Sequence, residues 1–377
     1  MPQIPFDQPY SKNCDYSSKI IIEFYENFNY DNSVKKKKGR LFFLYPEVRK
    51  VEKEMNMLFI TNRTPKQSAK SKRNRKLTFN YDTTAVSQYL YFCERNDKDD
   101  YIEVMSKALF GQLKNLPEKT QLLFYIHGFN NNMEPDIFDN AQKLQSLINA
   151  RSDGLVYVIP VIWPCDDDSA IAFIDDYWDD QDAADASGPA FSRLLGKFDT
   201  WRRSKKQQEI PCLKRINILA HSMGNRVLKN ALNHWATKYS SGNMPQLFRN
   251  VFMIAADIEN GVLERNQPGR HIVDSSRNIV VYYANDDLAM PASKLANLKN
   301  KTVSRRMGMT GPERLSKLPK KVYEVDCDDF NNSYDLKGHS YFLNDSEGNA
   351  SPIIEHMTRA IETGRISPEV RSYVLKQ

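Results

Sequence analysis

Ser222 is the residue of this chain whose surroundings best suit nucleophilic chemistry. It stands in INILAHSMGNRVLKNAL (216–232), where the apolar run of a strand gives way to helical spacing. Ala220 and Gly224 lie two positions before and after it. A tight strand-to-helix turn lifts a serine above the sheet and needs small residues at both places, usually as G-x-S-x-G. The sequence predicts a nucleophile at Ser222; the alternative is a small-residue junction without chemistry.

A serine hydroxyl needs a base within hydrogen-bond distance before it can attack a carbonyl. Of six histidines, only His339 stands in a polar loop after the last strong strand pattern, and His271 is a weaker alternative. The acid that orients such a histidine is expected at a strand end, in the order Ser, Asp, His. Asp286 and Asp287 end NIVVYYANDD and fit that order. Asp257, at the end of NVFMIAAD, competes with them.

The oxyanion of an acyl-transfer reaction needs two backbone donors. One donor normally follows the nucleophile, and the other comes from the loop after an earlier strand. We therefore predict the N–H groups of Met223 and Phe129, the latter in the loop that begins His127-Gly128. The side chain of His127 is expected to be structural, bridging loops. This chemistry requires no metal or organic cofactor, and we expect neither.

Short apolar strand patterns alternate with helical patterns from residue 120 onward. The strand patterns are 121–128, 155–163, 216–220, 250–256, 278–284 and 321–326, and 55–63 and 77–82 read as two more upstream. The stretches 100–116, 138–149 and the region after Ser222 show helical spacing. This alternation predicts an α/β fold with a mostly parallel central sheet and helices on both faces.

The composition is that of an ordinary globular protein, with 377 residues, 41% hydrophobic and 27% charged. Apolar runs are too short to cross a bilayer, and the N-terminus lacks a secretory pattern. The five scattered cysteines fit reduced thiols. These features predict a cytoplasmic protein, whose oligomeric state the sequence leaves open.

Two basic clusters and one acidic segment carry the uneven charge. The basic residues at 35–38 and 70–76 have few aromatic neighbours, so we expect no nucleic-acid partner and interpret them as solvated loops. The acidic segment at 165–187 lacks the spacing of a calcium loop and is interpreted as a solvated face. Its aromatic residues Phe173, Tyr177 and Trp178 could line a substrate entrance or pack the segment onto the domain.

Several motifs together resemble a known family. The motifs are IHGFNN, VIWP, LAHSMGNRVL, AADI, YYANDDLAM, RMGMTGP and GHSYF. They resemble the bacterial α/β-hydrolase family catalogued as domain of unknown function 900, over roughly residues 57 to 345. The resemblance implies a Ser-Asp-His triad with Ser222 and His339. It favours Asp287 over Asp286 as the acid, because the family's N-D-x-A-L segment aligns with 286–290, although a swap of the two stays open.

The resemblance and the patterns together predict three regions. These are an N-terminal accessory segment (1–54), an α/β-hydrolase domain (55–348) and a C-terminal helical extension (349–377). The acidic segment, following the fourth predicted strand, is a possible cap insertion at 165–210. The function predicted is that of a serine esterase acting on a small-molecule or lipid-like acyl substrate. The alternatives are a non-catalytic binding module with this fold and an acyltransferase using the same triad.

Overall fold

The computed structural model describes residues 56–377 apart from 82, 166–172 and 288–304. The predicted N-terminal accessory segment, the basic cluster at 35–38 and part of the acidic segment lie outside these residues. Residues Glu52–Gln377 form one compact unit.

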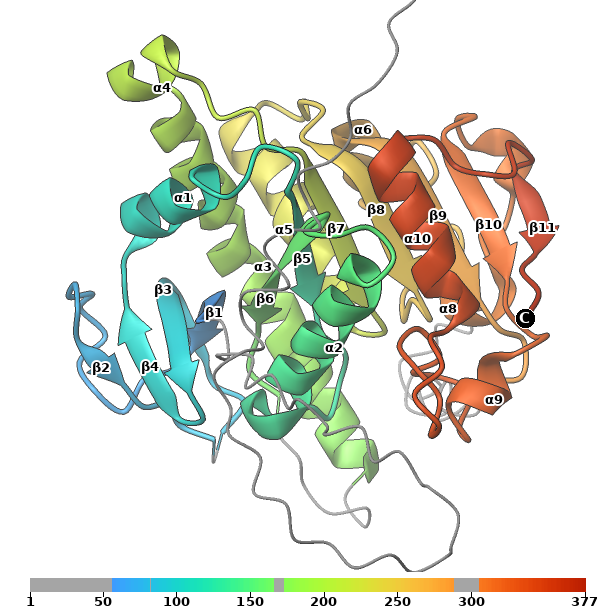
Figure 1. Cartoon of the computed structure of the whole chain (residues 1–377), viewed down its shortest axis with the longest axis horizontal. Helices are drawn as coiled ribbons and strands as arrows, with labels where there is room; N and C mark the ends of the chain where they lie inside the picture. The colour runs from blue at the N-terminus through green and yellow to red at the C-terminus, as the bar shows by residue number, and fades with distance from the viewer. Residues whose placement is uncertain (1–55, 82, 166–172, 288–304) are drawn as a thin grey trace, which may run out of the picture. The chain divides into compact units, whose positions relative to one another are not determined.

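One eleven-stranded sheet runs through the described part of the chain, in the order β11-β10-β9-β8-β7-β5-β6-β1-β3-β4-β2 (Figure 1). The strands are β1 (Met57–Arg63), β2 (Lys76–Leu77), β3 (Val86–Asp97), β4 (Asp100–Glu103), β5 (Gln121–Ile126), β6 (Val156–Ile162), β7 (Ile216–His221), β8 (Phe248–Ile254), β9 (Ser276–Tyr283), β10 (Val322–Asp326) and β11 (Ser372–Val374). From β11 to β1 all neighbours pair in parallel, and β1, β3, β4 and β2 pair antiparallel. The predicted mostly parallel sheet of an α/β fold is confirmed.

Helices cover both faces of this sheet. They are α1 (Ser106–Lys114), η1 (Met133–Ile137), α2 (Phe138–Asn149), α3 (Phe173–Arg202), α4 (Lys205–Glu209), α5 (Gly224–Tyr239), α6 (Arg270–Ser275), α8 (Met307–Thr310), η2 (Leu315–Lys317), α9 (Asn331–Tyr334) and α10 (Pro352–Thr363). One core contains buried residues of α1, α3, α5 and α6, and the other contains those of α2 and α10. Successive strand residues serve opposite cores: Leu122 faces the first and Leu123 the second, as a strand covered on both sides requires.

Three details differ from the sequence interpretation. The stretch 100–116, predicted as one helix, is the short strand β4 followed by α1. The acidic segment follows β6, the sixth strand rather than the fourth, because β3 and β4 had not been recognised. The C-terminal residues 349–377 are not purely helical, since β11 pairs in parallel with β10 and extends the sheet.

The helix α3 carries most of the acidic segment that the structure describes. It lies in the crossover from β6 to β7, and its residues Ala184, Ala190 and Phe191 belong to the first core. The long helix therefore packs its apolar side onto the sheet, and its role as a cap over 165–210 stays a prediction.

Candidate active site

Ser222 occupies a sharp turn between a strand and a helix. The strand β7 ends at His221 and α5 begins at Gly224, so two residues make the whole connection. The backbone of Ser222 has a φ of 50°, in the left-handed region that non-glycine residues rarely adopt. Its N–H donates a hydrogen bond of 2.9 Å to the carbonyl of Ile254 in β8. The turn is therefore strained and held by the neighbouring strand.

Two glycines, Gly224 in the turn and Gly128 in the loop after β5, allow close packing around Ser222. A Cβ atom on Gly224 would lie 2.5 Å from the carbonyl oxygens of Ile126 and His127, which are backbone atoms and cannot easily move. A Cβ atom on Gly128 would lie 3.0 Å from the Cβ of Ser222. The loop after β5 thus packs directly against the serine, and Gly224 meets the spatial need that its position in the sequence suggested.

His339 and Asp287 are joined by a short hydrogen bond. The Nδ1–H of His339 donates to Oδ2 of Asp287 at 2.7 Å, which leaves the lone pair on Nε2. The Asp287 side chain is fully buried, while the His339 side chain keeps 16% of its surface exposed. Asp287 follows β9 and His339 lies in a loop after β10, which are adjacent strands, so the fold brings the two together across 52 residues.

Charges around His339 raise the pKa of its ring. Burial alone lowers this pKa, but the hydrogen bond to Asp287 and the negative charges of Asp287, Asp257 and Asp335 outweigh it. The positive form of the ring is therefore stabilised beyond that of an ordinary histidine.

The His339 ring lies beside the residue that precedes Ser222. The Nε2–H of His221 donates to the His339 carbonyl at 3.2 Å, and the two ring centroids are 4.9 Å apart. Among the described residues no hydrogen bond links the Ser222 hydroxyl to the His339 ring. Hydrogen bonds of this kind are commonly long before substrate binds.

The two alternative acids have other partners. Asp286 accepts hydrogen bonds from the side-chain amides of Asn331, at 2.6 Å, and Asn332. Asp257 forms a buried ion pair of 3.2 Å with Arg306 and accepts a hydrogen bond from the hydroxyl of Tyr177. Neither carboxylate is hydrogen-bonded to the His339 ring in the described part of the chain.

Asp257 nevertheless contributes to the same site. Its backbone N–H donates to the carbonyl of Ser222 at 3.2 Å. Tyr177, on α3, packs its ring edge-on against Phe129, with 5.7 Å between the ring centroids. The side chain of Tyr177 is buried, so α3 brings a tyrosine to the loop after β5 and to the serine turn at once.

The predicted oxyanion donors, Phe129 and Met223, lie on these same two segments. Met223 precedes the first residue of α5, and the N–H groups at the start of a helix have no acceptor within the helix. The positive end of the helix dipole favours negative charge at this place. Phe129 directly follows Gly128, whose backbone packs against Ser222.

The remaining histidine predicted to be structural has that role. The buried ring of His127 stacks on the indole of Trp163, with 5.1 Å between centroids, and accepts a hydrogen bond from the Trp163 backbone N–H. Burial lowers the pKa of His127 to about 3, so the ring is neutral. The weaker base candidate, His271, is buried in α6 and lies 4.0 Å from the exposed carboxylate of Asp274.

Two contributors were not found from the sequence. Asp335 accepts hydrogen bonds from the backbone N–H groups of His339 and Ser340 at 2.9 and 2.7 Å, and so shapes the loop that carries the histidine. An aspartate four residues before His339, followed by a glycine, is a turn signal that could have identified it. The second contributor is Arg306, whose ion pair with Asp257 no spacing rule indicated.

The chain matches the model of a known family. The family is described as an α/β hydrolase of unknown function (DUF900), and the match covers residues 103–354. The chain belongs to this family. The matched DUF900 range contains Ser222, Asp287 and His339 but begins after β1, whose LFITNR segment the sequence resemblance had included. The family's RMGM and AADI segments are in contact here, since a Cβ on Gly308 would lie 2.4 Å from the Ala255 carbonyl carbon.

Comparison with other known proteins adds little to the DUF900 match. No curated protein matches the chain. A similar solved structure is phospholipase PlaB from Legionella pneumophila in complex with thio-NAD, at 14% identity and a TM-score of 0.22. The likeness covers 63% of this chain and 44% of that chain, so this chain spans less than half of the phospholipase structure.

Within the described residues no helix is long and apolar enough to cross a membrane. Those residues also contain no group of three or more histidine, cysteine, aspartate or glutamate side chains arranged to hold a metal ion.

Proposed function

We propose that this member of the DUF900 family is a serine hydrolase that cleaves an ester or related acyl bond. The observation that carries the proposal is the 2.7 Å hydrogen bond between His339 and Asp287, beside a serine held at a φ of 50°. A buried carboxylate that fixes one histidine tautomer next to a strained serine turn is typical of serine hydrolases.

In the proposed reaction, Ser222 Oγ attacks the acyl carbonyl while Nε2 of His339 accepts its proton. Asp287 holds the ring with Nε2 facing the hydroxyl and stabilises the imidazolium that forms. The N–H groups of Met223 and Phe129 bind the oxyanion. The imidazolium then protonates the leaving alcohol, and water, activated by the same histidine, releases the acid and restores the serine.

The proposed substrate is a neutral acyl ester, small or lipid-like. Asp257, Asp287 and Asp335 all raise the pKa of His339 through their negative charge, so the site lies in a negative potential. This potential disfavours an anionic group next to the scissile bond and favours an uncharged one. A cytoplasmic location stays a prediction from the composition.

The test is labelling with a fluorophosphonate probe, together with hydrolysis of p-nitrophenyl esters of increasing chain length. We expect the wild type to be labelled and Ser222→Ala to be unlabelled, with hydrolysis reduced to the uncatalysed background. Ser340→Ala, which alters another serine near His339, is the matched control and should keep its label. Equal labelling of the wild type and Ser222→Ala would refute the assignment.

A further inference from the structure

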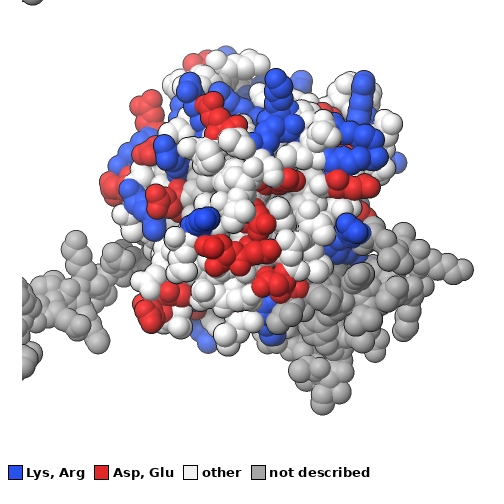
Figure 2. All heavy atoms as spheres, turned by 90° about the vertical axis from the view of Figure 1, so that its right-hand side faces the viewer, with Lys and Arg blue, Asp and Glu red and all other residues white. Residues whose placement is uncertain are grey.

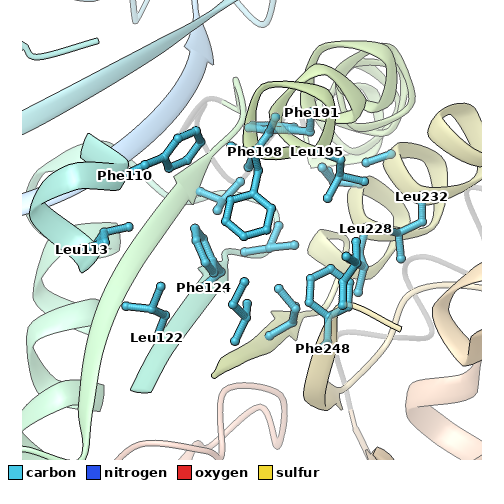
Figure 3. A pocket seen from close by; sticks show the side chains of 18 of the residues that line it. Phe110, Leu113, Leu122, Phe124, Phe191, Leu195, Phe198, Leu228, Leu232 and Phe248 are labelled. Atoms are coloured by element: carbon cyan, nitrogen blue, oxygen red, sulfur yellow. The ribbon is translucent and has the colours of Figure 1, made fainter. Parts of the chain in front are cut away.

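A cavity with an apolar lining lies between the sheet and helices α1, α3 and α5. In Figure 3 the rings of Phe124 and Phe248 from the strands and Phe198 from α3 point into one space. The volume of this space is about 90 Å³. Empty space of this kind is costly in a protein core, which is normally close-packed. A cavity that is kept apolar and open suits an apolar ligand better than water.

The lining residues closest in sequence to the Ser222 turn are buried, and the more exposed ones lie elsewhere. Two of the buried lining residues are Ile126, the last residue of β5, and Val227, near the start of α5. They are only 5% and 1% exposed. Three other lining residues are half-buried: Phe198 and Trp201 near the end of α3, and Ile216. Ile216 is the first residue of β7, so the opening lies where the parallel strands begin. Ser222 is not among the residues that line the cavity.

A basic groove adjoins the opening. The groove has a volume of about 680 Å³ and shares Phe110 and Trp201 with the apolar cavity. Lys107, Arg193 and Lys197 line it, without any acidic residue. Within the part of the chain that the structure describes, none of these three cations forms an ion pair. The groove thus offers unneutralised positive charge directly beside an apolar hole.

We propose that cavity and groove together bind a single-chain amphiphile with an anionic head, namely a fatty-acid carboxylate. A dry cavity of roughly 150 Å³ takes one benzene ring, so about 90 Å³ takes the last three or four carbons of a chain. The rest of the chain lies along the packed rings of Phe110 and Trp201, whose centroids are 5.5 Å apart, and the carboxylate reaches Arg193 and Lys197. Arginine and lysine both pair with carboxylates, and the adjacent apolar wall strengthens the pairing by excluding water.

This proposal concerns a second site and stands independently of the hydrolase proposal. The helix α3 links the two places, because Tyr177 near its start contacts Asp257 and Trp201 near its end lines the cavity. Occupancy of the cavity therefore bears on the same helix that reaches the candidate active site.

Binding is tested by titrating the full-length Ser222→Ala protein with monomeric decanoate and following tryptophan fluorescence. We expect a saturable change that is lost in Trp201→Phe, although three other tryptophans remain. Ala231→Phe places a ring in the cavity and should weaken decanoate binding about tenfold, because about two methylene groups lose their burial. The uncharged decanol should bind more weakly than decanoate.

The double variant Arg193→Gln/Lys197→Gln keeps the test decisive if Ala231→Phe fails to fold, since both side chains lie at the surface of the groove. It should weaken decanoate binding several-fold and leave decanol binding unchanged. The proposal is overturned if decanoate gives no saturable change, or if neither variant alters its affinity. A response to anionic vesicles without one to monomeric decanoate would also overturn it, because the ligand would then be a membrane surface.

Discussion

The two edges of the sheet handle buried polar groups in opposite ways. At the carboxyl edge, where the parallel strands end, Asp287 is fully buried against the ionisable ring of His339, and Ser222 sits in a strained turn. At the amino edge, where they begin, the buried polar groups are uncharged amides and hydroxyls, among them Asn250 and Ser276. The contrast is consistent with the proposed function, in which the carboxyl edge carries the chemistry and the amino edge stabilises the fold.

The amides of the amino edge form a chain across four strands. The side-chain amide of Asn278 donates to Asn250 at 2.8 Å, that of Asn250 to Asn217 at 2.8 Å, and that of Asn217 to Gln121 at 3.3 Å. Asn217 also pairs in register with Asn250, and Asn250 pairs in register with Asn278. An amide carries both donors and acceptors, so amides can be linked in series without any charge.

The same amides satisfy the end of a helix. Gln121, Asn250 and Asn278 donate to the carbonyls of Ile361, Ala360 and Gly364, at the C-terminus of α10. Carbonyls at a helix end have no partner within the helix, and buried ones must find another. The amide row therefore fastens α10 to the sheet.

The surface charge follows the same division. Figure 2 faces the β11 side and shows many basic side chains in its upper part, interspersed with acidic ones, and a group of acidic side chains near the middle. Arg277, Lys320 and Arg371 line a groove at the beginning of β9 and β10. Asp326 is the last residue of β10, at the other end of these strands. Burial raises its pKa, and the negative charges of Asp328 and Asp286 raise it further.

The largest effect on activity short of removing Ser222 is expected from Asp287→Asn. The amide stabilises the wrong tautomer of His339, and we expect kcat to fall by about four orders of magnitude while the melting temperature changes little. The measurement is ester hydrolysis with circular dichroism. Asp286→Asn is the matched control, because its carboxylate faces Asn331 and Asn332 instead. A larger loss in Asp286→Asn than in Asp287→Asn would exchange their roles.

The opposite result is expected at the amino edge from Asn250→Ala. It removes the acceptor of Asn278 and the donor to Asn217, leaving two buried groups unsatisfied. At about 1–3 kcal/mol per group, the free energy of unfolding should fall by about 2–6 kcal/mol. Urea unfolding measures this loss, and kcat at a temperature where the variant is folded should not change.

The exposed Asn243→Ala serves as its control and should keep the stability of the wild type. If Asn250→Ala reduced kcat as strongly as it reduced stability, the two edges would not be functionally separate.

The pH dependence of hydrolysis is expected to reflect the protonation of His339 and the negative carboxylates around it. The base form of His339 is neutral, and the pKa of the ring is raised above the ordinary 6.5. Activity should therefore rise with pH through this raised pKa, with a midpoint above 6.5 in kcat/KM. Asp287→Asn removes the main group that raises the pKa and should move the midpoint downward. A wild-type midpoint below 6.5 would contradict the role of these carboxylates.

The sequence predicted regular elements better than loops. The strand patterns from residue 120 onward and the helix at 138–149 follow directly from apolar runs and helical spacing, and the sheet has them. The stretch 86–103 was not recognised as strands, because its apolar run at 90–93 is short and polar residues such as Gln88, Glu94 and Arg95 flank it. β3 pairs antiparallel with β1 and β4, and antiparallel strands are often less continuously apolar than parallel strands buried on both faces.

At the site, Ser222, Asp287 and His339 were predicted from the order of serine, aspartate and histidine along the chain. The choice between Asp286 and Asp287 stayed open. Neighbouring residues of one loop differ only in which way they point, and that depends on contacts from Asn331 and Asn332, far along the chain. Arg306 could not be predicted for the same reason. Only Asp335 left a local signal, because its hydrogen bonds are made within five residues.

The smallest of these effects on activity is expected from Asp335→Asn. This variant compares the loop that carries His339 with the similar turn held by Asp345. Oδ2 of Asp335 accepts the N–H groups of His339 and Ser340, and Oδ1 accepts that of Lys337 at 3.2 Å. Burial raises the pKa of Asp335, but these N–H groups outweigh it and lower the pKa, so the carboxylate is charged. An amide has one acceptor oxygen instead of two and no charge.

The variant should therefore lower kcat about tenfold, since hydrogen bonds to a charged group contribute about 1.5–3 kcal/mol, and should move the pH midpoint slightly downward. Asp345→Asn is the matched control. Asp345 is a half-buried residue whose carboxylate accepts hydrogen bonds from the N–H groups of Glu347 and Asn349 in a similar turn. Within the described residues Asp345 forms no hydrogen bond or ion pair with His339 and is not among the charges that raise its pKa, so its loss should leave both kcat and the pH midpoint unchanged. Equal loss of activity in both variants would mean that Asp335 stabilises the loop only generally, whereas a pH shift confined to Asp335→Asn identifies it as the residue that positions His339.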